Sequence, residues 1–195
     1  MSASDTARSI LLAARALLDE GGAQAISMRK VAQRVGVTAM AIYRHFPDRD
    51  ALVNALADKG FVELSQTLLS RVPPGVPVLE GMASVIEIYL DFALAQSHLF
   101  ELMFLASRPG ARQFPQDFAA GRSPTANLFA TMLRQGIAEG LFREGEDIWE
   151  ITFETGALMQ GLVMLYLGGR IDLDADGFRA LVRRSMGRYI HGIRA

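Results

Sequence analysis

Apolar residues recur every three to four positions along nearly the whole chain, the spacing of helices that bury one face. No segment of the sequence shows sustained two-residue alternation or a hairpin turn of the Asn-Gly type. The pattern therefore predicts an all-α fold. The expected helices are 5–21, 27–35, 38–46, 48–68, 78–96, 98–106, 123–140, 147–168 and 174–191.

Capping residues set several of these expected boundaries. Ser27, Thr38 and Asp48 each precede a short apolar repeat and can accept a hydrogen bond from the free amides of a helix start. Gly36 follows the second helix, where a left-handed residue can end it. These signals predict three short helices in succession, followed by a longer helix that begins near residue 48.

The strongest break in the pattern is the run Val-Pro-Pro-Gly-Val-Pro at 72–77. We place the domain boundary within the helix that precedes it. This gives one domain at 1–52 and a second at 53–195. The connection 107–122 is long for a helical protein, and we expect it to be mobile.

The segment 27–46 has the form of a helix-turn-helix unit, because two short helices meet at a Gly-Val-Thr turn. Its charge differs from that of the rest of the chain. Five basic residues against the single acid Asp48 give 27–49 a charge of +4, while the whole chain carries −1. Such a local positive patch attracts phosphate groups.

Packing needs on the second helix of this unit indicate which side chains face outward. Ile42 and Phe46 are required inside, so their neighbours are left to meet base edges and phosphates. The candidate DNA contacts are Ser27, Arg29, Thr38, Ala39, Met40, Tyr43, Arg44, His45 and Arg49. Spacing alone leaves open a helix-turn-helix that never contacts DNA, with Tyr43 half-buried in packing and His45 a surface side chain.

A longer string settles the interpretation by resemblance. From Ser27 it reads Ser-Met-Arg-Lys-Val-Ala-x-x-Val-Gly-Val-Thr-x-x-x-Ile-Tyr-Arg-His-Phe-Pro-x-Arg-x-Ala-Leu. Over roughly residues 6–60 this resembles the tetracycline-repressor (TetR) family of bacterial transcription regulators. The resemblance implies a homodimer. In each chain, 1–52 would be a three-helix helix-turn-helix domain that binds DNA, and 53–195 would be a helical ligand-binding and dimerisation domain.

Roles for individual residues also follow from this resemblance. It implies that Thr38, Tyr43, His45 and Arg49 hold the DNA backbone, while Ala39, Met40 and Arg44 face the bases. Family members often have Gly where Met40 stands, so a bulky side chain here leaves the operator sequence open.

The composition of the chain indicates an excess of apolar surface. Half of the residues are apolar, and the mean hydropathy is +0.20. The longest uncharged stretch, 155–169, has 15 residues, whereas a membrane span needs roughly 17 to 20. We therefore expect a cytoplasmic protein that does not enter a membrane. With no Cys and three scattered His, we expect no disulfide, no metal site and no cofactor.

This apolar surface could be buried in a subunit interface formed by the last two expected helices. The helix 147–168 is apolar nearly all round, and 174–191 carries a broad apolar stripe. Two such helices from each of two subunits would form a symmetric four-helix interface. The candidate interface residues are Ile151, Thr155, Leu158, Leu162, Phe178, Leu181, Val182, Ser185 and Tyr189. The alternative is that both helices fill the core of a monomer.

Apolar side chains of the middle helices could instead line a cavity for a small molecule. The candidate ligand contacts are Tyr89, Phe92, Phe100, Met103, Phe104, Phe129, Met132, Trp149, Phe153 and Gln160. The alternative is plain core, with Gln160 satisfied by the backbone. A weaker resemblance, over roughly 85–170, is to a TetR subgroup named for a Trp–His–Gly signature. This chain reads Gln160-Gly where that subgroup has His-Gly.

Together these features predict a dimeric repressor that binds a palindromic operator and is released by an apolar or amphipathic molecule. One alternative is a regulator without a small-molecule ligand. The other is a helical small-molecule enzyme, which we do not expect because no catalytic constellation is visible in the sequence.

Overall fold

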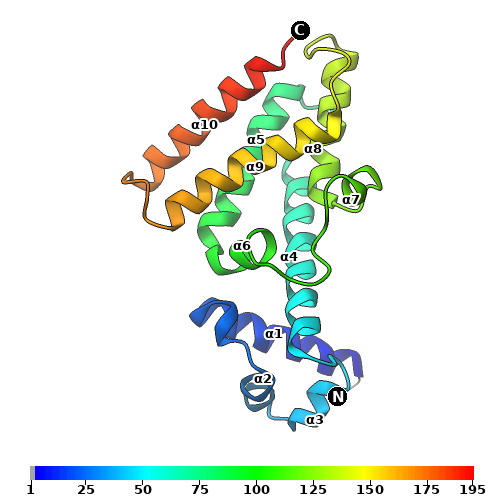
Figure 1. The fold of residues 1–195 in the computed structure, drawn as a ribbon, viewed down its shortest axis with the longest axis vertical. Helices are drawn as coiled ribbons and strands as arrows, with labels where there is room; N and C mark the ends of the chain where they lie inside the picture. The colour runs from blue at the N-terminus through cyan, green and yellow to red at the C-terminus, as the bar shows by residue number, and fades with distance from the viewer. Residues whose placement is uncertain (1–2) are drawn as a thin grey trace. The chain divides into compact units, whose positions relative to one another are not determined.

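A computed structural model describes residues 3–195 of the chain. Within that range the structure consists of helices, turns and one isolated bridge between Phe142 and Arg194, with no strand. The all-α prediction is confirmed (Figure 1). The elements are α1 (Ala3–Gly21), η1 (Ala23–Ala25), α2 (Met28–Val35), α3 (Ala39–Tyr43), α4 (Arg49–Arg71), α5 (Val78–Ala95), α6 (Ser97–Phe104), α7 (Gln116–Ala119), α8 (Pro124–Ala138), α9 (Ile148–Leu167) and α10 (Ala175–Gly192).

The chain divides into two compact units. The first contains the residues up to Glu63 together with Ala95–Ala111, and the second contains Leu64–Leu94 and Arg112–Ala195. Contacts therefore split α4 between the units, and they group α6 with α1. The predicted domain boundary after residue 52 stays a prediction about where the DNA-binding segment ends. No helix within residues 3–195 has the length and apolar character needed to cross a membrane.

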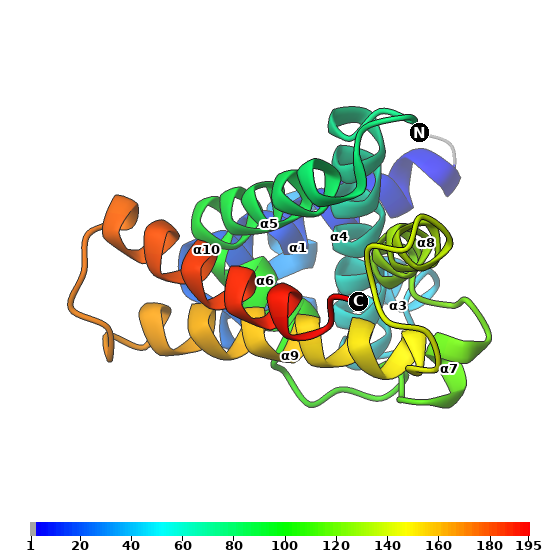
Figure 2. The same cartoon turned by 90° about the horizontal axis from the view of Figure 1, so that it is seen from above.

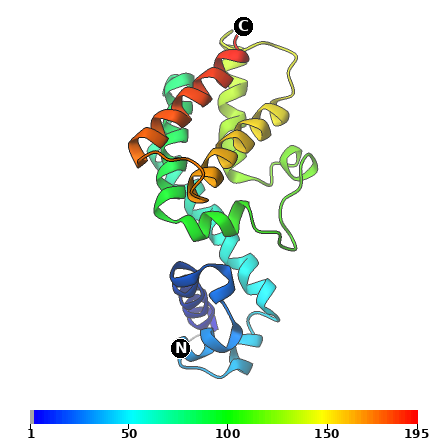
Figure 3. The same cartoon turned by 60° about the vertical axis from the view of Figure 1, so that its left-hand side comes forward.

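In the first unit, α1 packs against α2, and α2 packs against α3 (Figure 3). The predicted caps are confirmed. The Ser27 hydroxyl oxygen accepts a hydrogen bond from the Lys30 amide, and Thr38 accepts one from the Ala41 amide. Gly36 takes the left-handed conformation with φ 76°. The third helix is shorter than predicted, because its hydrogen bonds tighten into a turn after Tyr43.

Helix α6 is held in the first unit by close packing on α4. A Cβ at Gly60 would lie 3.1 Å from Leu99 Cδ2, so glycine allows the two helices to approach closely. At the start of α6, His98 Nδ1 lies 3.2 Å from the carbonyl oxygen of Asp19 in α1. The short helix α6 is thus an integral part of the unit that contains α2 and α3.

In the second unit, α10 lies between α5 and α9 (Figure 2). The Arg183 side chain of α10 donates to Glu87 of α5, with Nη2 and Oε2 3.0 Å apart. On the other side, the Tyr189 hydroxyl donates to Glu154 of α9 at 2.6 Å. The core of this arrangement includes Phe178 and Val182, both fully buried.

The connection 107–122 contains a short helix, α7, that the sequence pattern did not predict. Phe114 stacks on Phe153 of α9 with ring centroids 4.6 Å apart, and Phe118 meets the same ring edge-on at 5.5 Å. Asp117 also pairs with Arg122 at 2.9 Å. Aromatic packing on α9 therefore supports the part of this connection that belongs to the second unit.

Candidate nucleic-acid interface

The outer face of α3 presents the side chains that the spacing assigned to it. Met40 is 70% exposed and Tyr43 is 46% exposed, while Ile42 is fully buried beneath them. Ala39 and Arg44 are also exposed. A helix of five residues can hold this orientation because Ile42 anchors one side and the Thr38 cap fixes the start.

The cations around α2 and α3 differ in whether they are paired with an acidic side chain of the same chain. Arg34 is paired with Glu20 of α1, with Nη1 and Oε1 2.8 Å apart. Within the described residues, the side chains of Arg29, Lys30 and Arg44 have no hydrogen bond or ion pair. These three cations are therefore the ones available to an external anion such as a phosphate.

Arg49 forms hydrogen bonds within the first unit. Its Nε donates to the carbonyl oxygen of Ile26 at 3.0 Å, and its Nη2 donates to that of Ala23 at 2.6 Å. The guanidinium thus joins the start of α4 to the segment that precedes α2. These contacts position the segment that leads into α2, and phosphate contact by Arg49 stays a prediction.

Ser27 and Thr38 keep their predicted places at helix starts. Each hydroxyl oxygen accepts from a backbone amide, which leaves its proton free to be donated to another acceptor. His45 is half-buried next to the exposed Arg44. The predicted contacts thus belong to α2, α3 and the residues next to them, apart from Arg49, which begins α4.

The predicted ligand contacts divide between the two units. Phe100, Met103 and Phe104 belong to the first unit, where the Phe104 ring meets Phe61 edge-on at 5.1 Å. Their role there is to pack α6 against α4. They therefore cannot line a cavity that lies within the second unit alone. Sequence spacing could not show this, because α6 follows α5 directly along the chain.

The remaining candidates lie in the second unit. Tyr89, Phe92, Phe129 and Met132 are buried, and burial raises the pKa of Tyr89 well above its usual range. The Gln160 side chain partly offsets this effect of burial on the pKa of Tyr89. These candidates are mostly aromatic and sulfur side chains, with the Tyr89 hydroxyl and the Gln160 amide as the polar groups among them. The last two candidates, Trp149 and Phe153, contact other side chains. The Trp149 ring lies 5.3 Å from the Arg134 guanidinium, and Phe153 stacks on Phe114.

The predicted interface residues also separate into two groups. Ile151, Thr155, Phe178 and Val182 are buried inside the chain itself, so they cannot add contact area with a partner. This corrects the sequence analysis at those positions. Leu158, Leu162, Leu181, Ser185 and Tyr189 are half-buried and remain candidates.

Two apolar residues of α9 were missing from the predicted interface. Met164 is 50% exposed and Leu165 is 37% exposed. In a helix that is apolar all round, the hydrophobic pattern does not show which face remains open. The available signal was the spacing of four residues from Leu158 to Leu162 and of three residues from Leu162 to Leu165.

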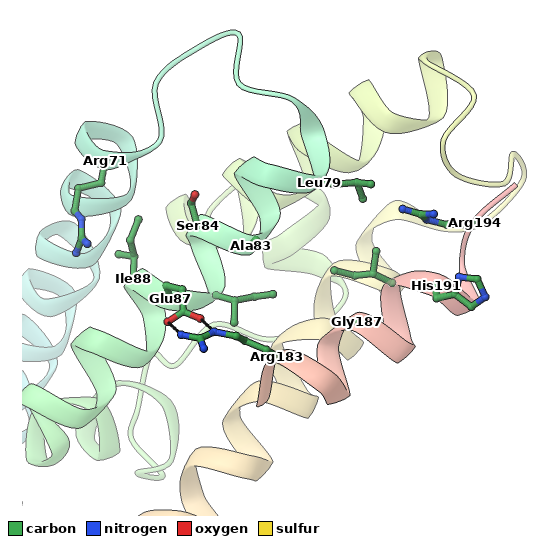
Figure 4. Close-up of a pocket in the computed structure, with 12 residues that line it drawn as sticks. Arg71, Leu79, Ala83, Ser84, Glu87, Ile88, Arg183, Gly187, His191 and Arg194 are labelled. Atoms are coloured by element: carbon green, nitrogen blue, oxygen red, sulfur yellow. Dashed lines mark hydrogen bonds and ion pairs between the residues drawn. The ribbon is translucent and has the colours of Figure 1, made fainter. Parts of the chain in front are cut away.

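The structure also contains a hollow of about 730 Å³ between α5 and α10 that the sequence did not predict (Figure 4). It is lined from α5 by Leu79, Ala83 and Glu87, among others, and from α10 by Arg183 and Gly187. Neither helix shows a motif that predicts it, because the hollow depends on the absence of side chains at facing positions.

Two parts of the chain match known families. Residues 10–56 match the bacterial regulatory proteins of the tetR family, and residues 82–189 match the tetracyclin repressor-like C-terminal domain. The second match alone spans more than half of the chain.

Individual relatives and solved structures are similar to this chain over most of its length. The chain is 28% identical over 172 residues to the nucleoid occlusion factor SlmA of Alteromonas mediterranea, covering 84% of this chain and 80% of that protein. A structure of a protein of unknown function from Rhodococcus sp. RHA1 has a TM-score of 0.78 and 29% identity, covering 97% and 96% of the two chains. A TetR family regulator from Agrobacterium tumefaciens shares the fold, with a TM-score of 0.69, 22% identity and full coverage of both chains. The chain therefore belongs to the TetR family of DNA-binding transcription regulators with a helix-turn-helix motif.

Proposed function

We propose that this regulator is a homodimeric repressor that binds a palindromic operator and leaves it when a small molecule binds the second unit. The observation that carries the DNA-binding part is the outer face of α3. Met40 stands 70% exposed near Tyr43 and Arg44, and the Arg44 side chain has no hydrogen bond or ion pair with any residue that the structure describes. An exposed apolar and cationic face on a helix of this motif suits the major groove. We place the repressor in the cytoplasm and assign it no cofactor.

Dimerisation through α9 and α10 is supported by the apolar surface that these helices leave uncovered. Met164 and Leu165 are exposed, and Leu158 and Leu162 are half-buried on the same helix. A C2 pairing of this surface would cover it and would present two copies of α3 to a palindromic site.

Release by a ligand is supported by the buried Tyr89 and the half-buried Gln160. Both belong to the second unit, where Phe92, Phe129 and Met132 are also buried, and polar groups in such a setting can orient a mostly apolar ligand. Helix α5, which carries Tyr89, continues into α6, and α6 packs on α1 and α4 of the first unit. A ligand that binds better to one position of α5 would shift α6 and thereby the DNA-binding helices.

DNA recognition is tested by fluorescence anisotropy with an operator selected from random duplex DNA. Arg44→Ala should weaken operator binding and change base preference by about 1–3 kcal/mol for each affected base pair. Arg170→Ala, an exposed cation outside the helix-turn-helix, is the matched control and should leave both unchanged. Equal effects of the two variants would contradict the assignment.

The dimer is tested by light scattering on the full chain. Leu165→Glu should convert the dimer to a monomer, because it buries a charge in the proposed interface. Leu173→Glu places the same change at an exposed leucine outside both helices and should leave the dimer intact. A monomeric wild-type protein would overturn this part of the proposal.

Ligand release is tested by titrating the operator complex with a panel of apolar and amphipathic compounds. A compound that releases the wild-type protein should need a roughly tenfold higher concentration with Gln160→Leu, because one polar contact is lost. Release that is equally efficient in Gln160→Leu would place the ligand elsewhere.

A further inference from the structure

The hollow between α5 and α10 lies entirely within the second unit. Its volume of about 730 Å³ falls in the range of small-molecule sites, roughly 300–1,000 Å³. Figure 4 shows Leu79, Ala83 and Glu87 on one wall and Arg183, Gly187 and Arg194 on the other. Helices α5 and α10 thus form two walls of the site.

The middle of the hollow is apolar and unfilled. Leu79, Ile86 and Ile190 supply hydrocarbon surface, and Ala83 is too small to reach across. A Cβ at Gly187 would meet nothing within 4 Å, so the α10 wall is open at this point. The space therefore accepts an apolar chain without any movement of the protein.

The cations around the hollow differ in whether they form an ion pair. Arg183 is paired with Glu87 at 3.0 Å, and Arg71 is paired with Asp91 at 3.2 Å. Arg194 and His191 have no side-chain hydrogen bond or ion pair with any described residue. In Figure 4 these two side chains stand at the end of the hollow away from the Glu87–Arg183 pair. That end can therefore neutralise an anion, while the opposite end is already neutralised internally.

We propose that this hollow binds an amphipathic organic anion. Its carboxylate is held by Arg194 and His191, and its hydrocarbon chain lies over Leu79, Ala83 and Ile190 toward the Glu87–Arg183 pair. The anion is selected because Arg194 offers charge-assisted hydrogen bonds, and the chain is selected because it covers the apolar middle. This site goes beyond the proposed function and does not depend on DNA binding or on the Tyr89–Gln160 site.

The dimensions fit a medium-chain carboxylate. From Leu79 to Glu87 the hollow follows α5 for about 12 Å, from the helical rise per residue. An octanoate chain fits within this length in an extended form. Octanoate is therefore the probe, and 1-octanol is the matched compound with the same chain and no charge.

The test is isothermal titration calorimetry on the full chain. Octanoate should bind once per chain with a Kd at or below about 1 mM, and 1-octanol should bind at least about tenfold more weakly. Gly187→Phe should abolish octanoate binding by filling the open wall. Arg194→Gln should raise the Kd roughly tenfold by removing the head-group contact.

Matched controls separate this result from unfolding or binding elsewhere. Ala138→Phe adds the same ring at an exposed position of α8 outside the hollow and should leave octanoate affinity unchanged. Circular dichroism and light scattering verify that each variant keeps its helix content and oligomeric state. Undiminished binding to Gly187→Phe, equal binding of 1-octanol, or no saturable binding to the wild-type protein would each overturn the proposal.

Discussion

Replacing Arg49 by methionine removes two hydrogen bonds that join the start of α4 to the segment before α2. These bonds link Arg49 Nε to the Ile26 carbonyl at 3.0 Å and Nη2 to the Ala23 carbonyl at 2.6 Å. Methionine keeps the hydrocarbon stem, so packing along the side chain is largely retained. The substitution therefore isolates the contribution of the guanidinium donors.

The expected loss is modest because the site is partly open to water. Charged donors on carbonyl acceptors can stabilise a protein by more than neutral ones, but the Arg49 side chain is 42% exposed. Two such bonds together should contribute about 1–2 kcal/mol to the free energy of unfolding. For a chain of this length the loss should lower Tm by roughly 2–8 °C.

The assay compares Arg49→Met with Arg29→Met, because Arg29 is an exposed cation without a partner in the described residues. Differential scanning calorimetry gives Tm, and operator binding over a range of salt concentrations gives the number of phosphate contacts. Arg29→Met should leave Tm unchanged and reduce the salt slope of a dimer by about 2, since each protomer loses one contact. Arg49→Met should lower Tm and leave that slope nearly unchanged.

The opposite pattern would refute this reasoning. If Arg49→Met kept its Tm and reduced the salt slope as Arg29→Met does, Arg49 would be a phosphate contact. The sequence-based assignment would then be correct, and the two carbonyl contacts would be of no consequence for stability.

Two further substitutions test packing and charge in the second unit. Gly136→Ala should destabilise the protein by about 1–3 kcal/mol in urea unfolding, because its Cβ would overlap the ring of Phe142. Gly187→Ala, whose Cβ meets nothing within 4 Å, is the control, and equal losses would contradict this explanation. Glu87→Gln tests pH dependence: the hydrogen bond from Arg183 lowers the pKa of Glu87 from its ordinary 4.5. The stability advantage of wild type over Glu87→Gln should be complete above about pH 4.5 and vanish as pH falls through the lowered pKa, whereas a pH-independent difference would exclude this linkage.

Local signals in the sequence were sufficient to predict most helix starts and stops. Ser27, Gly36 and Thr38 act within three residues of their own positions, so their roles do not depend on the rest of the fold. The exposure of Met40 followed in the same way, because Ile42 had to point inward. For these reasons the form of the helix-turn-helix could be predicted without a structure.

Contacts between distant segments could not be predicted. The carbonyl partners of Arg49 lie more than twenty residues away, and α7 is supported by rings that pack on Phe153 of α9. The apolar pattern of α10 likewise could not distinguish Phe178, which fills the core, from Leu181, which is only half-buried. Each of these outcomes depends on which helix lies alongside, and single-chain periodicity contains no such information.

The central claim is that two copies of α3 recognise a palindromic DNA sequence. Selection from a random duplex library with the purified full chain tests it most directly. The predicted result is an enriched inverted repeat whose half-sites are centred about 34 Å apart, or a multiple of that distance. Arg44→Ala should change the enriched bases. A wild-type protein that enriches no sequence over the starting library would contradict the claim.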